Sequence, residues 1–159
     1  PYTTLFRSEE TLEKLGIELP PAPQAAGLYK PLFVHDGLAY FSGHLPLLPD
    51  GEMITGKLGE NLSVEEGAQA ARQVGLNILA TVRENFGSLD KVNRVIKLLG
   101  MVNAQPEFTQ HPQVINGCSE LFRDVWGEGR GVGTRSAFGV SGLPAGACVE
   151  IEGILLLGE

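Results

Sequence analysis

The spacing of apolar residues predicts a long helix in the middle of the chain. Apolar side chains recur at helical spacing between Ser63 and Gly87, as on one buried face of a helix. Ser63-Val64-Glu65-Glu66 forms a capping box, in which the serine hydroxyl accepts from the amide of Glu66 and the Glu66 carboxylate accepts from the amide of Ser63. Gly87 suits the position just past a helix end. We therefore expect a helix over residues 64–86.

A second helix is predicted over residues 112–126. Pro112 fits the first helical position, where its missing amide proton loses no hydrogen bond. The apolar residues that follow share one face of a helix: Val114, Ile115, Cys118, Leu121, Phe122 and Val125.

The segments with strand character are short and lie next to turns. Residues 32–34 and 38–43 flank the turn His35-Asp36-Gly37, and residues 53–55 follow another Asp-Gly turn, so the pattern predicts an opening β-meander. Residues 91–102 are rich in β-branched side chains and predict a further strand, although their period is ambiguous.

The last segment, GTRSAFGVSGLPAGACVEIEGILLLGE, carries charges on two apolar runs. If residues 141–146 turn an antiparallel hairpin, Arg135 falls opposite Glu152 and diagonal to Glu150 on one face. Charges on apolar strands cost free energy unless they are paired or used. The pattern thus indicates either a chemical site or a structural ion pair at a sheet edge or subunit contact, and spacing alone leaves both open.

The order of elements predicts an α+β fold, in which two helices pack on one face of a mixed sheet. The other face then needs a cover, which self-association supplies. Residues 1–27 are predicted to be an N-terminal arm and linker, with a short helix capped by Ser8 and ending at Gly16, followed by extended PPAPQAAG. Residues 28–159 form the predicted domain.

The composition of the chain argues against several kinds of partner. The net charge is −7 and the isoelectric point is near 5.0, which argues against a nucleic-acid partner. No apolar run approaches the roughly 18 residues of a membrane span, and the opening PYTTLFRSEE lacks signal-peptide features, so we expect a cytoplasmic protein without a membrane partner. Cys118 and Cys148 are expected to be buried free thiols. His35, His44 and His111 are scattered, so no metal site is expected.

Several motifs together resemble the YjgF family, also called the Rid or reactive-intermediate deaminase family. They are S-G-H-L-P at residues 42–46, a capped helix, V-I-N at 114–116, and R-S-A, L-P and V-E-I-E between residues 135 and 152. The resemblance spans about residues 28–157. It implies a chorismate-mutase-like α+β fold, a homotrimer, and small-molecule clefts between adjacent subunits.

The same resemblance implies roles for individual residues. Arg135 matches the arginine that binds a substrate carboxylate, and Glu150 matches the acidic residue that holds or activates water. The residues implied to bind substrate in the cleft are Tyr29, Ser42, Asn116 and His44, the last in place of the usual glutamine. Each of these residues also has a purely structural interpretation. Tyr29 would be an aromatic residue at a strand edge, and Ser42 a hydroxyl on the sheet. Asn116 would be an exposed helix residue, and His44 a surface turn residue.

The chain also departs from the family pattern. Gly27-Leu28-Tyr29-Lys30-Pro31 replaces G-P-Y-S-Q-A, Ala137 replaces a frequent cysteine, and the segments near residues 101–112 and 127–133 are longer than usual. These departures are typical of a longer subgroup, to which the family's deaminase activity does not transfer automatically.

The leading hypothesis is hydrolysis of small 2-imino acids or their enamine tautomers to 2-keto acids and ammonia, an activity like that of 2-iminobutanoate/2-iminopropanoate deaminase. It needs no metal or organic cofactor, because an iminium carbon is already electrophilic. The alternative is a trimer that binds small carboxylate metabolites without turnover, for regulation or scavenging. Endoribonuclease activity is the least favoured hypothesis, because the chain is acidic and has no track of Lys and Arg.

Overall fold

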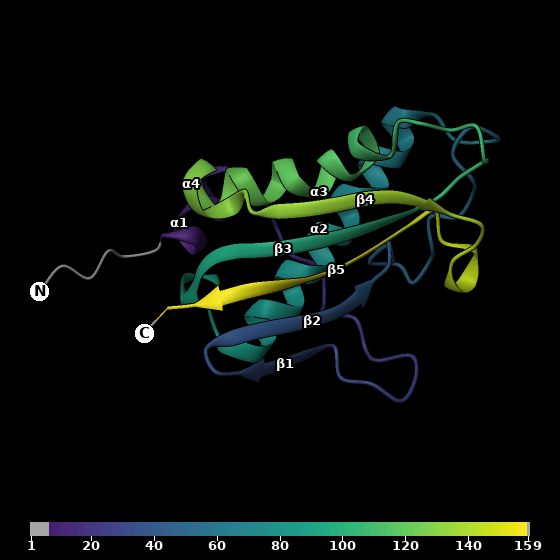
Figure 1. Ribbon diagram of the computed structural model, residues 1–159. Coiled ribbons are helices and arrows are strands. Elements are labelled where there is room, and N and C mark those ends of the chain that lie inside the picture. The colour runs from purple at the N-terminus through teal and green to yellow at the C-terminus, as the bar shows by residue number, and fades with distance from the viewer. Residues whose placement is uncertain (1–6, 159) are drawn as a thin grey trace, which may run out of the picture.

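One mixed β-sheet organises the molecule. A computed structural model describes residues 7–158. Its strands are β1 (Leu32–His35), β2 (Leu38–His44), β3 (Val92–Asn103), β4 (Thr134–Val140) and β5 (Val149–Leu157). They form a five-stranded sheet in the order β1-β2-β5-β3-β4 (Figure 1). Neighbouring strands are antiparallel except β3 and β4, which are parallel.

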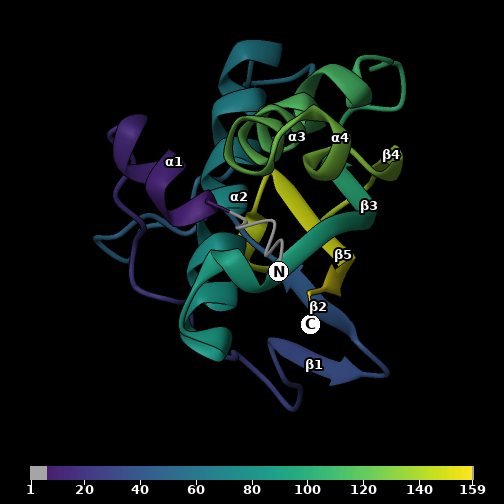
Figure 2. The same ribbon diagram turned by 90° about the vertical axis from the view of Figure 1, so that its left-hand side faces the viewer.

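Two long helices cover one face of this sheet, which confirms the predicted α+β class. They are α2 (Val64–Phe86) and α3 (His111–Trp126), and they lie side by side (Figure 2). The capping box at Ser63 is present: the amide of Glu66 donates a 3.1 Å hydrogen bond to the Ser63 hydroxyl, and the amide of Ser63 donates a 3.0 Å bond to the Glu66 carboxylate. A short helix, α4 (Glu128–Gly131), follows α3. None of the helices within residues 7–158 is long and apolar enough to cross a membrane.

Close contact between α2 and α3 depends on a glycine. A Cβ added to Gly117 of α3 would overlap the backbone carbonyl oxygen of Ala68 on α2. The helices therefore meet backbone to backbone at this point. Cys118, the next residue, is fully buried beside them, and both cysteines are free thiols as predicted.

Gly117→Ala is expected to lower the free energy of unfolding by about 1–3 kcal/mol, because the methyl group forces the two helices apart in a packed interior. Urea unfolding followed by circular dichroism measures the change. Gly129→Ala in α4 is the matched control, because a Cβ there meets nothing within 4 Å. Equal losses in the two variants would contradict the packing argument.

The predicted terminal hairpin is wrong. β3 lies between β4 and β5, pairing parallel with the first and antiparallel with the second. The crossover through α3 places β4 parallel to β3 at the sheet edge, as such connections require. The loop after β4 then passes over the end of β3, where Asn103 donates its amide proton to the carbonyl of Cys148. β5 consequently enters the sheet on the other side of β3.

The predicted opening meander is correct only for its first two strands. β1 and β2 join through Asp36 and Gly37, whose φ angles of 49° and 78° suit a tight antiparallel turn. Residues 53–55 do not form a sheet strand. Met53 makes an isolated bridge to Leu47, and Thr55 makes another to Ala147. This segment therefore pairs with loops and not with β2.

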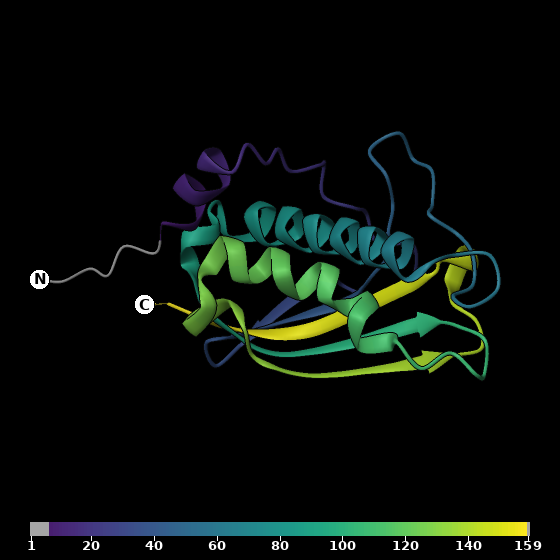
Figure 3. The ribbon, with the colours of Figure 1, turned by 90° about the horizontal axis from the view of Figure 1, so that it is seen from above.

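The second face of the sheet carries no helix within residues 7–158 (Figure 3). Phe33, Tyr40 and Phe138 are 52%, 41% and 41% exposed, and Phe33 and Tyr40 pair across β1 and β2. Phe138 lies on β4 at the opposite edge of the sheet. Exposed aromatic side chains on an uncovered sheet face are typical of a surface that another chain covers. Self-association remains a prediction.

The arm contains a helix that packs on the rest of the molecule. This helix, α1 (Ser8–Lys14), buries Leu12 in the main hydrophobic cluster. The prediction that Ser8 caps it is wrong: Arg7 is the N-cap without a side-chain cap, and Ser8 lies buried in the first turn. From α1 the linker runs along the outer side of α2 before it reaches β1 (Figure 3). The boundary between residues 1–27 and 28–159 remains a prediction, and residues 1–6 lie outside the described part.

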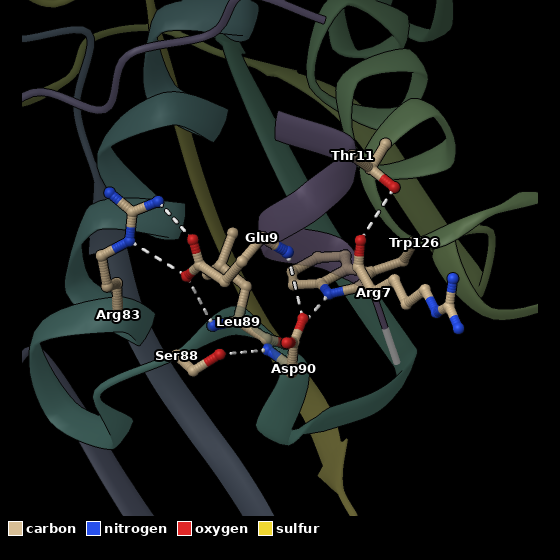
Figure 4. Close-up of polar contacts among 8 residues, drawn as sticks. All are labelled: Arg7, Glu9, Thr11, Arg83, Ser88, Leu89, Asp90 and Trp126. Carbon is tan, nitrogen blue, oxygen red and sulfur yellow. Dashed lines mark hydrogen bonds and ion pairs between the residues drawn. The ribbon is translucent and has the colours of Figure 1, made fainter. Parts of the chain in front are cut away.

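Glu9 fixes α1 to the end of α2. Its carboxylate accepts two hydrogen bonds from Arg83, one of 3.0 Å from Nε, and one of 2.9 Å from the amide of Leu89 (Figure 4). In return, Asp90 accepts a 3.0 Å bond from the amide of Glu9. Burial alone would raise the pKa of Glu9, but the Arg83 and Leu89 hydrogen bonds and the Arg83 charge outweigh it and lower this pKa.

Glu9→Gln is expected to cost about 1 kcal/mol of folding free energy at neutral pH, since charged hydrogen bonds are lost at a partly exposed site. Because the folded pKa is lowered, this stabilisation is present above the unfolded pKa and disappears as pH falls through the folded pKa. Urea titrations at neutral and acidic pH test both statements. Glu10→Gln is the control, because Glu10 makes only exposed pairs with Arg7 and Lys14. A wild-type unfolding energy in Glu9→Gln would contradict the docking role.

Candidate functional site

Arg135 projects from β4 toward α3. Its backbone pairs with Leu98, a core residue of β3, so its side chain lies on the helix-covered face of the sheet. Nη1 donates hydrogen bonds of 2.8 Å to Oδ1 of Asn116 and 3.0 Å to Oγ of Ser119. One nitrogen of the guanidinium is thus held by two uncharged oxygen acceptors. Ser119 escaped the sequence prediction, although it follows Asn116 by one helical turn and shares its face of α3.

A pocket of about 350 Å³ opens beside this guanidinium. We call it the Arg135 pocket; its walls are Leu98, the exposed face of α3, α4 and the start of β4, with the polar side chains Asn116, Ser119, Glu120, Arg123 and Glu128. Among the described residues, no carboxylate lies within 4.0 Å of Arg135. The half-buried positive charge therefore faces a space large enough for a small anion.

Glu150 lies elsewhere, on the uncovered face of the sheet. It pairs with Met101 of β3, and its carboxylate packs so closely on Gly43 that any Cβ there would overlap Oε2. Burial raises the pKa of Glu150, and the negative charge of Glu152 on the same face raises it further. A carboxyl group with a raised pKa takes up a proton more readily than an ordinary glutamate does.

Arg135 and Glu150 do not share one surface of the chain, contrary to the hairpin prediction. Arg135 faces the helices, whereas Glu150 faces away from them, and β3 separates their strands. The alternative of an Arg135 ion pair with Glu150 or Glu152 within one chain is therefore wrong as well. A site that uses both side chains needs a second copy of the chain.

Ser42 ties the segment before β1 to the sheet, and Tyr29 makes a hydrogen bond within that segment. The hydroxyl of Ser42 donates a 2.6 Å hydrogen bond to the carbonyl of Lys30. The hydroxyl of Tyr29 accepts a 3.1 Å bond from the amide of Ala26, and its ring is 47% exposed. Both residues are near the end of β2, on the same side of the molecule as Gly43.

His44 is buried between β2 and α2, with 4% exposure, so its interpretation as a surface turn residue is wrong. Nδ1 lies 2.6 Å from the carbonyl oxygen of Ser42, and Nε2 lies 2.8 Å from the hydroxyl of Thr81. Burial lowers the pKa of His44, an effect partly offset by the Ser42 hydrogen bond. The neutral ring therefore acts first as a structural link to α2.

The predicted site residues thus fall into two groups. Arg135 and Asn116 belong to the Arg135 pocket. Tyr29 and His44 line a second pocket of about 240 Å³, together with Gly43, on which Glu150 packs. Within residues 7–158, no three His, Cys, Asp or Glu side chains gather as metal ligands would.

Comparison with known proteins places this geometry in a family. A family model described as "YjgF/chorismate mutase-like, putative endoribonuclease" matches residues 9–149. The chain belongs to the YjgF family. The resemblance drawn from the motifs is thereby confirmed, and the match begins already within α1.

The similar proteins match this chain over most of its length. Protein TCP17 of Trypanosoma cruzi is 40% identical over 151 residues, 95% of this chain and 94% of TCP17. The crystal structure of Atu1372 from Agrobacterium tumefaciens, a protein of unknown function, is 38% identical with a TM-score of 0.85, covering 95% and 94% of the two chains. E. coli TdcF, solved with bound serine, is 25% identical with a TM-score of 0.60, covering 88% and 96%.

Proposed function

We propose that this protein hydrolyses small 2-imino acids, or their enamine tautomers, to 2-keto acids and ammonia. The observation that carries the proposal is the half-buried Arg135 guanidinium, which faces a pocket and has no carboxylate partner among the described residues. A guanidinium that faces a pocket without a carboxylate in direct contact is suited to an anionic ligand, although Glu120 and Glu128 also line this pocket. The serine bound to TdcF supports a small ligand that carries a carboxylate.

Arg135 positions the substrate. With Nη1 held by Asn116 and Ser119, the planar guanidinium still has donors to offer a carboxylate in two parallel hydrogen bonds. The carboxylate is thereby oriented, and the adjacent C2 atom is presented to water at a fixed place.

Glu150 moves the protons. Its carboxylate removes a proton from the water that attacks C2 of the iminium, which gives a carbinolamine, and the protonated group returns this proton to the nitrogen. The C–N bond then breaks as the C=O bond forms, and the proton of the C2 hydroxyl passes to the carboxylate while ammonia leaves. The raised pKa of Glu150 suits both directions of transfer. This sequence consumes one water molecule and no redox equivalent.

We further propose that the cleft forms between copies of the chain in a homotrimer. The positions of Arg135 and Glu150 on opposite sheet faces support a shared site, since the Glu150 side of one copy can close on the Arg135 pocket of the next. The uncovered aromatic face supports assembly. Analytical ultracentrifugation tests it, and a monomer at micromolar concentration would refute the shared cleft.

The activity is tested by generating imino acids with an amino-acid oxidase and following ammonia release with and without the purified protein. Faster release in proportion to protein concentration is the expected result. Ligand-dependent thermal stabilisation by carboxylates without any acceleration would instead favour the binding protein without turnover.

A further inference from the structure

The second pocket is built by segments outside the sheet. We call it the linker pocket. One wall is the linker, through Pro23, Ala26, Tyr29 and Pro31, and the other is the loop after β2, through Leu45 and Met53. Its volume is about 240 Å³, below the range of drug-sized ligand sites, so it suits a side chain better than a whole larger ligand.

Both walls are fixed by hydrogen bonds. Asn77 of α2, 2% exposed, donates bonds of 2.9 Å and 3.0 Å to the carbonyls of Leu45 and Leu47. Gln73 donates a further 3.2 Å bond to the carbonyl of Leu47. On the linker side, the Ser42 bond to Lys30 and the Tyr29 bond to Ala26 hold the chain in place. The pocket is therefore preformed.

The lining offers mostly apolar surface. Prolines, aliphatic residues and the Tyr29 ring dominate it. The two ring nitrogens of His44 are engaged by Ser42 and Thr81, and the Tyr29 hydroxyl accepts a bond from Ala26. The other polar side chain of the lining, Gln24, is exposed. A ligand group without hydrogen-bonding atoms fits such a lining best, because a polar group would lose its water without replacement.

The linker pocket adjoins the proposed chemistry through Gly43. This glycine lines the pocket, and the Glu150 carboxylate packs on it. We propose that the linker pocket binds the side chain of the substrate and selects apolar, branched aliphatic 2-imino acids over those with a methyl group. This inference rests on the proposed function, and it makes the N-terminal linker a determinant of specificity.

Binding of stable 2-oxo acids tests the inference without turnover. Pyruvate, 2-oxobutanoate and 4-methyl-2-oxopentanoate differ only in the aliphatic group, and isothermal titration calorimetry gives each Kd. We expect the affinity to rise about three- to fourfold for each added methylene that is buried. Equal affinities across the series would overturn the inference and leave the proposed hydrolysis intact. Absence of binding by all three acids would also overturn the inference. The ammonia-release assay tests the hydrolysis independently.

Two variants fill the pocket from opposite walls. Ala26→Trp and Met53→Trp are expected to abolish the preference for the longer acids and to keep pyruvate binding within about threefold, since the cation at Arg135 is untouched. Ala25→Trp is the matched control, because Ala25 is exposed and does not line the pocket. Circular dichroism and sedimentation confirm that each variant keeps its fold and assembly. An undiminished preference in both filled variants would overturn the inference.

Discussion

Arg135→Ala is expected to lower kcat/KM for 2-imino acid hydrolysis by about 10²–10⁴-fold. Two charge-assisted hydrogen bonds to the substrate carboxylate are lost, each worth about 1.5–3 kcal/mol. Arg135→Lys should recover only part of the activity, because an ammonium keeps the charge but cannot make the paired planar contact. The ammonia-release assay with oxidase-generated substrate measures both variants.

Arg123→Ala is the control for the loss of Arg135. Arg123 lines the same pocket, but its side chain is 49% exposed and lies beside Asp124, so a small effect is expected. Sedimentation of Arg135→Ala should match the wild type. Wild-type turnover in Arg135→Ala would remove this residue from the mechanism and with it the main support for the proposal.

Glu150→Gln is expected to lower kcat by about 10²–10⁴-fold with a smaller change in KM, because the amide cannot take or return a proton. The matched control is Glu152→Gln, two residues along the same face of β5. Removal of the Glu152 charge lowers the pKa of Glu150, so the acidic limb of the pH–rate profile should move to lower pH while kcat stays near the wild-type value. An unchanged kcat in Glu150→Gln would assign proton transfer to another group.

Glu150→Gln is also expected to change how the free energy of unfolding depends on pH. Burial raises the folded pKa of Glu150 above its unfolded value, so the folded protein holds this proton more tightly than the unfolded chain does. The wild type should therefore lose stability relative to Glu150→Gln as pH rises through the folded pKa. Urea unfolding of both proteins from pH 4 to pH 8 measures the difference, and parallel curves would contradict the desolvation of Glu150.

Local signals were enough to predict the two long helices and the first turn. The capping box at Ser63, Gly87 after the helix, and Asp36-Gly37 between β1 and β2 each act over a few residues, and all appear in the structure as expected. The family motifs identified Arg135, which does face a pocket. The fold class followed from the order of the elements.

Pairing across the sheet could not be predicted in the same way. Whether β4 meets β5 or β3 depends on contacts between distant segments, and this choice sets which face Arg135 and Glu150 occupy. The interpretation of His44 as a surface turn residue was wrong because the register of β2 shifts between Phe41 and His44. This irregularity turns the imidazole toward α2. No local sequence signal predicts the irregularity.

The course of the linker has a consequence for how selectivity can diverge among relatives. Its upstream end is tethered by Glu9 to the far end of α2, and its downstream end forms a wall of the linker pocket. If the linker pocket selects the substrate side chain as proposed, substitutions in the linker would change which 2-imino acid is preferred and leave Arg135 and Glu150 in place. Under the proposed selectivity, the choice of substrate would depend on a segment that contributes neither Arg135 nor Glu150.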